Sequence, residues 1–211
     1  MAAVDWHISK ERVAALFDGI VAITATLLVL EIQVPPSTEV IEWSDLMEAF
    51  RHFVHWGVSF AMIAMIWVEF HVVFNHCSKW DSGLLITTLC QLGAINLIPF
   101  AAGMVGEHPE SLAAAIVFCA TMGLNGAFVG LNALMVRRRR HLHPHDESHR
   151  SLGVRLRWQV AVYGGAVVVS VVSAVVGKPF AGIVAWIFCP LVLGANHHRL
   201  GRTVAGPESH A

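Results

Sequence analysis

Charged residues are scarce in this sequence. Aspartate, glutamate, lysine and arginine together make up 14% of the 211 residues, whereas 55% are hydrophobic. Because a soluble domain carries roughly 25% charged residues, this composition favours an integral membrane protein. The formal net charge of -1 gives no overall basic field for nucleic acid, so we expect no nucleic-acid partner.

Motifs for catalysis and for metal or disulfide chemistry are also missing. No HExxH, Walker loop or Ser/His/Asp arrangement occurs at a recognisable spacing, so we expect no enzyme activity. The 4 cysteines form no CxxC or CxxxC pair and lie mostly inside long apolar runs, which is typical of buried apolar residues. Neither a cofactor nor a resident metal is therefore expected.

Long apolar runs dominate the sequence instead. A helix crosses the hydrocarbon core of a bilayer with about 20 predominantly apolar residues, and six stretches qualify or come close. The chain is thus predicted to be all-α, a single six-helix membrane domain covering residues 1–211. The predicted spans lie at approximately 13–34, 53–75, 83–105, 112–136, 158–177 and 179–196.

Most lysine and arginine residues lie on one side of the membrane in this arrangement. With six spans, both termini and the loops at 76–82 and 137–157 share a face that holds all but Arg51 and Lys178 of the 14 basic residues. An excess of Lys and Arg marks the cytoplasmic side, so both termini are predicted to be cytoplasmic. The run Arg137–Arg140 directly follows a span, which predicts contact with anionic lipid headgroups.

The segment between the first two spans is acidic and amphipathic. Pro35 and Pro36 end the first helix, because proline cannot continue the helical hydrogen bonds. Ser44 before Asp45 predicts the cap of a separate short helix on the outer surface.

The first predicted helix carries an aliphatic stripe. Ile23, Leu27, Leu30 and Val34 are spaced i, i+4, i+7 and i+11, and Thr26 shares the edge of this stripe. In a monomer such a stripe would face the core or the lipid. In a symmetric oligomer it could surround a central axis and gate by dewetting. Periodicity alone leaves both interpretations open.

Ionisable residues inside the spans need an explanation, because one at mid-membrane costs about 2.5 to 3.5 kcal/mol. Asp18 of the first helix lies at a depth similar to that of Glu69 and His71 of the second. We favour a structural polar clamp between the two helices, and the alternative is a proton relay or an ion site. Arg12 is six residues from Asp18, so the two cannot form an ordinary i,i+4 pair.

Two further features have competing interpretations. Gly123, Gly126 and Gly130 of the fourth span favour close helix packing within the subunit over a dedicated dimer face. The histidines of segment 141–149 could bind a transition metal weakly or sense pH, but a solvated loop is the favoured interpretation.

Residues 12–32, RVAALFDGIVAITATLLVLEI, resemble the signature of the transmembrane protein 175 family of potassium channels. That signature is R-x-x-x-F-S-D followed by an A-I-x-x-T-L-L-x-L-E-like run. Segment 67–74 is similar to the W-x-x-H-H-x-x-F ending of the family's second helix, and segment 96–100 to the L-x-P-F stretch of its third. The chain departs from the pattern at three positions, with Leu16 for Phe, Phe17 for Ser and Phe70 for the first His.

The resemblance implies a potassium-preferring cation channel in a bacterial plasma membrane, a homotetramer whose four first helices line the pore. Potassium would be the permeant ion, with other monovalent cations passing less readily. The runner-up function is a proton-coupled or metal-cation transporter that uses the intramembrane Asp18, Glu69 and His71. The resemblance assigns the pore and filter to Ile23, Thr26, Leu27 and Leu30, the pore-mouth charge to Glu31, and a structural polar network to Arg12, Asp18, Trp67 and His71.

Overall fold

The described part of the chain is entirely helical and contains no strand. The computed structural model describes residues 9–32, 43–75, 77, 80–108, 110–138 and 146–177, together with 182, 185, 186, 188, 189, 192 and 193. Its elements in chain order are α1 (Lys10–Leu27), the 3-10 turn η1 (Leu28–Glu31), α2 (Trp43–Asn75), α3 (Ser82–Ile95), α4 (Ile98–Glu107), α5 (Leu112–Arg138) and α6 (Asp146–Val175).

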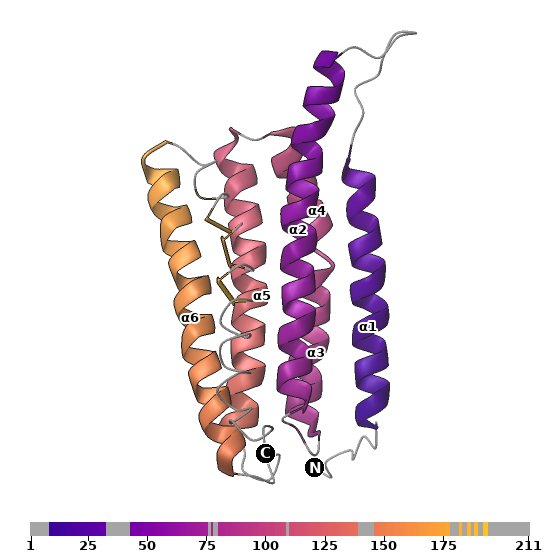
Figure 1. Cartoon of the computed structure of the whole chain (residues 1–211), viewed down its shortest axis with the longest axis vertical. Helices are drawn as coiled ribbons and strands as arrows, with labels where there is room; N and C mark the ends of the chain where they lie inside the picture. Colours follow the sequence, from indigo (N-terminus) through magenta and orange to yellow (C-terminus); the bar gives the residue numbers. More distant parts are fainter. Residues whose placement is uncertain are drawn as a thin grey trace, which may run out of the picture.

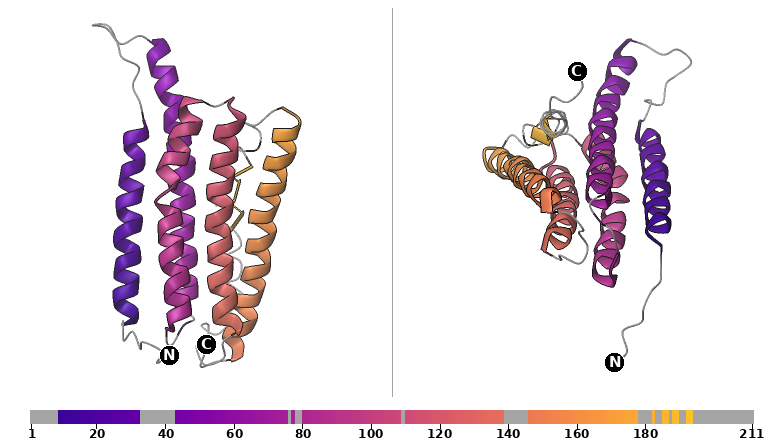
Figure 2. Two further views of the ribbon diagram at one scale, coloured as in Figure 1. Left: turned by 180° about the vertical axis from the view of Figure 1, so that it is seen from behind. Right: turned by 60° about the horizontal axis from the view of Figure 1, so that its bottom comes forward.

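The helices stand side by side, with α1 at one edge of the bundle and α6 at the other (Figure 1). Helices α3 and α4 follow one another in a single column, and α5 packs against this column and against α6. The views from behind and from below show the same arrangement (Figure 2). Helix α1 contacts α2, α3 and α4, so it buries one face and leaves the other open at the edge of the bundle.

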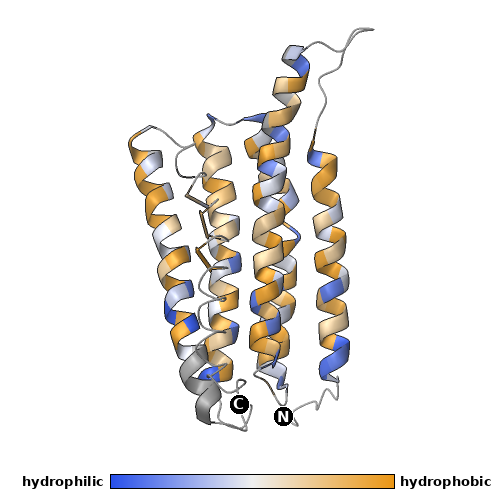
Figure 3. Cartoon of the chain, viewed as in Figure 1, coloured by the Kyte–Doolittle hydropathy of each residue, from blue (hydrophilic) through white to orange (hydrophobic). Residues whose placement is uncertain are grey.

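Within the described residues, 5 helical stretches are long and apolar enough to cross a membrane by length and composition. Apolar colouring runs along most of each helix (Figure 3). These stretches correspond in place to the first five predicted spans, whereas the sixth, 179–196, falls mostly outside the described residues. They are Lys10–Glu31, Asp45–Asn75, Ser82–Glu107, Leu112–Arg138 and Gly153–Ser173.

The prediction of a separate short helix after the two prolines is wrong. Helix α2 begins at Trp43 and runs without a break for 33 residues, because neither proline nor glycine interrupts the chain before Gly57. At 1.5 Å per residue it is about 50 Å long, which exceeds the roughly 30 Å of a hydrocarbon core. The acidic segment therefore extends the second helix instead of forming its own.

The predicted third span is long enough to cross a membrane, but it consists of two consecutive helices, α3 and α4. Pro99 has no amide hydrogen for the carbonyl of Ile95, so the helix ends there and restarts as α4 with Pro99 in its first turn. The Asn96 side chain at the break lies 2.7 Å, Oδ1 to Oγ1, from Thr24 of α1. This contact ties the outer half of α1 to the interior of the bundle.

The glycines of α5 face α6. A Cβ at Gly126 would lie 2.8 Å from the ring of Tyr163, and one at Gly123 would lie 3.4 Å from Val167. Close approach of the two backbones explains these small residues, so the predicted packing within the subunit is confirmed.

Candidate functional site

The outer half of α1 and the following turn η1 are divided into a buried and an exposed face. Thr24 and Leu28 are wholly buried, whereas Ile23 is 60% exposed, Leu27 45% and Leu30 71%. Thr26 is exposed as well, and its hydroxyl donates to the carbonyl of Ile23 at 2.7 Å. Ile23, Leu27 and Leu30 of the predicted aliphatic stripe thus lie on the open face of the edge helix, whereas Val34 lies outside the described residues.

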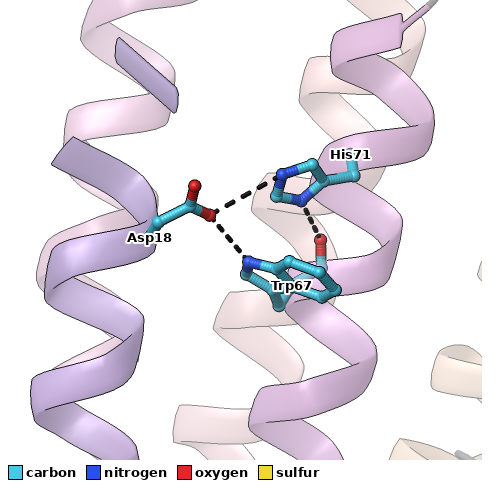
Figure 4. Close-up of polar contacts among 3 residues, drawn as sticks. All are labelled: Asp18, Trp67 and His71. Atoms are coloured by element: carbon cyan, nitrogen blue, oxygen red, sulfur yellow. Dashed lines mark hydrogen bonds and ion pairs between the residues drawn. The ribbon is translucent and has the colours of Figure 1, made fainter. Parts of the chain in front are cut away.

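A polar contact joins α1 to α2 near the basic end of the bundle (Figure 4). Trp67 Nε1 donates to Asp18 Oδ1 at 2.7 Å, and His71 Nε2 lies 3.6 Å from the same oxygen. His71 Nδ1 lies 3.0 Å from the carbonyl of Trp67. Because Trp67 and His71 are one helical turn apart, both side chains reach the same carboxylate.

The polar clamp predicted from the sequence is therefore present in part. Glu69 is not among its members, because it is two residues from both Trp67 and His71 and thus about 200° around the helix from each. Its side chain is buried, at 4% exposure, inside the bundle. Arg12 is exposed, and within the described residues it forms no ion pair with Asp18.

Sequence reasoning missed an aromatic contact beside this clamp. The rings of Phe17 and Phe70 are stacked, with centroids 3.6 Å apart and planes 4° from parallel. Both residues depart from the family signature, but the signature does not reveal that the two positions meet.

Glu31 turns toward its own subunit. Its carboxylate occupies the space that a Cβ on Gly103 of α4 would take. The ring of His52 approaches α4 in the same way, since a Cβ on Gly106 would lie 3.0 Å from His52 Nδ1. The role of Glu31 as a pore-mouth charge remains a prediction.

Among the described residues, no group of 3 or more His, Cys, Asp or Glu side chains could hold a metal ion. The histidines of the predicted weak metal site at 141–145 lie outside the described residues, as do Arg139 and Arg140. Arg137 and Arg138 form the last turn of α5, at the same end of the bundle as the start of α1 (Figure 1).

Comparison with known proteins confirms the resemblance noted from the sequence. Residues 12–99 match the family model described as endosomal/lysosomal potassium channel TMEM175. This segment contains the α1 stripe, the polar clamp and Pro99. The matched family is one of channels and not of enzymes.

Individual relatives agree with this match. A potassium channel of Streptomyces collinus is 26% identical over 191 residues, which are 88% of this chain and 86% of that protein. A potassium channel of Chamaesiphon minutus is 32% identical over 114 residues, or 51% of this chain and 56% of that protein. The endosomal/lysosomal proton channel TMEM175 of Bos taurus is 29% identical over 134 residues, 57% of this chain but only 28% of that protein.

A solved structure shares the fold. The crystal structure of a lysosomal potassium-selective channel TMEM175 homolog from Chamaesiphon minutus superposes with a TM-score of 0.70 at 25% identity. The superposition covers 87% of this chain and 97% of that chain.

Proposed function

Because this chain is related to the TMEM175 family through residues 12–99, we propose that it is a potassium-preferring cation channel. Four copies assemble with their first helices around a common axis, and cations pass down their gradient between these helices. The observation that carries the proposal is the exposed aliphatic stripe on α1 and η1, at one edge of the bundle.

A single copy cannot enclose a pathway with one edge helix, so the proposal requires a closed ring of copies. In such a ring Ile23 forms the narrowest constriction, Leu27 and Leu30 follow along the pore, and Thr26 lies beside the lining. An aliphatic constriction conducts only ions that shed part of their water. K+ holds its hydration shell less tightly than Na+, which favours potassium modestly.

Charged residues flank this pathway in the proposed assembly. Asp18, Trp67 and His71 hold α1 against α2, with Arg12 at the cytoplasmic end. Glu31 lies at the opposite end of α1 and supplies negative charge to the mouth.

We place the protein in a bacterial plasma membrane with the basic end of the bundle in the cytoplasm, where the arginines at the end of the fifth helix and after it contact anionic headgroups.

The test of the filter is Ile23→Asn in proteoliposomes and planar bilayers. The polar side chain should raise conductance and shift the reversal potential under a K+/Na+ gradient toward that of an unselective pore. Ile86→Asn on α3 is the matched control, since Ile86 is 59% exposed but lies outside the proposed pore. An unchanged reversal potential in Ile23→Asn would remove Ile23 from the filter.

Proton-coupled transport is the second candidate, favoured by the Asp18 and His71 pair inside the membrane-length helices. A transporter would show flux that saturates with substrate, depends on a proton gradient and disappears in Asp18→Asn. Under the channel proposal, flux stays passive and independent of the proton gradient. Asp18→Asn then changes only the strength of the α1–α2 contact.

A further inference from the structure

The two aromatic departures from the family signature contact each other. Phe17 and Phe70 are 0% and 4% exposed, and their rings lie face to face with centroids 3.6 Å apart. We propose that Phe17 and Phe70 are a matched pair of positioning residues that replaces a serine–histidine pair and fixes the rotation of the proposed pore helix. The effect on ion passage rests on the proposed channel function, whereas the pairing of Phe17 with Phe70 does not.

The stack lies directly beside the polar clamp. Phe17 precedes Asp18 in α1 and Phe70 precedes His71 in α2. The Phe70 ring also meets the His71 ring edge-on, with centroids 5.5 Å apart. The joint between the two helices therefore has a buried apolar layer and a partly exposed polar layer, and the apolar layer shields one side of the Asp18 contact from water.

Burial of Phe17 determines where the stripe points. Helical geometry places Ile23 about 120° and Leu27 about 80° away from Phe17 around the axis of α1. With Phe17 held in the bundle, these two side chains lie on the neighbouring faces of the helix, where they are exposed. The other buried residues of α1, Val13, Val21 and Thr24, are smaller than Phe17, so Phe17 is the largest side chain that α1 buries.

The two positions are expected to depend on each other. A serine at position 17 alone would leave a cavity beside the Phe70 ring and a buried hydroxyl next to carbon atoms. A histidine at position 70 alone would press a polar ring nitrogen against Phe17. With both changes, a turn of the imidazole can bring a ring nitrogen within hydrogen-bond distance of the hydroxyl, which satisfies both polar groups.

The experiment is a double-mutant cycle on the full-length protein in detergent and in bilayers. F17S and F70H should each lower the thermal midpoint and shift the K+/Na+ reversal potential toward zero. F17S/F70H should lose less of both than the sum of the two single losses, because the hydroxyl and the imidazole satisfy each other although the cavity left by the Phe17 ring remains. F17S/F74H is the matched control: Phe74 lies one turn after Phe70 and contacts Phe70, but the cycle should show only additive loss there. Reversal potential does not depend on how much protein folds, so it separates positioning from stability.

If the loss in thermal midpoint of F17S/F70H equals the sum of the losses of F17S and F70H, the pairing is overturned. Reversal potentials unchanged in the single variants, despite lower midpoints, would overturn the positioning role. If F17S fails to assemble, restored assembly in F17S/F70H but not in F17S/F74H supports the pairing, and equal failure of both overturns it. A wild-type protein without any cation current would instead refute the proposed function, and the thermal cycle would still decide the pairing.

Discussion

At the scale of single residues, Gly103 illustrates how an absent side chain positions a charge. The Glu31 carboxylate occupies the place of its missing Cβ, so Gly103→Ala must displace the carboxylate. The displaced group is the far end of a flexible side chain, so the cost is small, and we expect a thermal midpoint close to that of Gly93→Ala. Gly93→Ala is the control, since a Cβ there meets nothing within 4 Å. A clearly lower midpoint for Gly103→Ala would show that the Glu31 carboxylate cannot move away from α4.

Cys77, between α2 and α3, makes stability depend on pH. Burial raises the pKa of its thiol to about 11, against a smaller lowering by the charge of Lys10. A raised pKa favours the neutral thiol in the folded state. Its contribution is therefore complete below the unfolded pKa near 9 and is lost as pH rises through 11.

Cys77→Ala tests this dependence directly. The contact of Lys10 Nζ with the backbone carbonyl of residue 77, at 2.8 Å, does not require the thiol. From pH 8 to 11 the wild type should lose up to about 2 kcal/mol more stability than Cys77→Ala. If the free energy of unfolding falls equally with pH in both proteins over that range, the thiol of Cys77 does not have a raised pKa.

At the scale of elements, the contact between Thr24 and Asn96 joins α1 to the break before α4. Thr24→Val keeps the shape of the side chain but removes the hydroxyl, which lies 2.7 Å from Asn96 Oδ1 and 2.9 Å from the carbonyl of Ile20 in its own helix. We expect a loss of about 1 kcal/mol, typical of one buried hydrogen bond between helices. Thr26→Val is the control because it removes an exposed hydroxyl whose hydrogen bond stays within its own helix, without affecting Asn96. A similar effect of both variants on the thermal midpoint would argue against a tie between the elements.

Sequence reasoning located these elements better than it located their ends. Apolar runs predicted five of the membrane-length helices, since length and hydropathy are local properties. The start of α2 at Trp43 was missed because prolines end a preceding helix but do not determine where the next one begins. The stack of Phe17 on Phe70 was missed for another reason: it joins residues far apart in the chain, and periodicity within one helix does not specify its partner.

At the scale of the whole molecule, charged residues gather at the two ends of the bundle. Lys10, Arg12 and the last turn of α5 lie at one end, where Lys10 also stacks over Phe74 at 4.1 Å. Glu31 and Glu107 lie at the opposite end of α1 and α4. Between Asp18 and Glu31, α1 and η1 expose only aliphatic side chains and Thr26. A charge-free central stretch between charged ends is the arrangement that a hydrophobic constriction requires.

The assembly itself gives the last prediction. If four copies surround their α1 stripes, Leu27→Trp fills the pore with indole rings, so cation flux should fall at least tenfold. Native mass measurement should still find four copies, because in the proposed ring the substituted side chain points into the pore. Ile116→Trp on α5 is the control, since Ile116 is 55% exposed at a distance from α1. Full flux in Leu27→Trp, or a monomeric mass for the wild type, would exclude a pore built from the first helices.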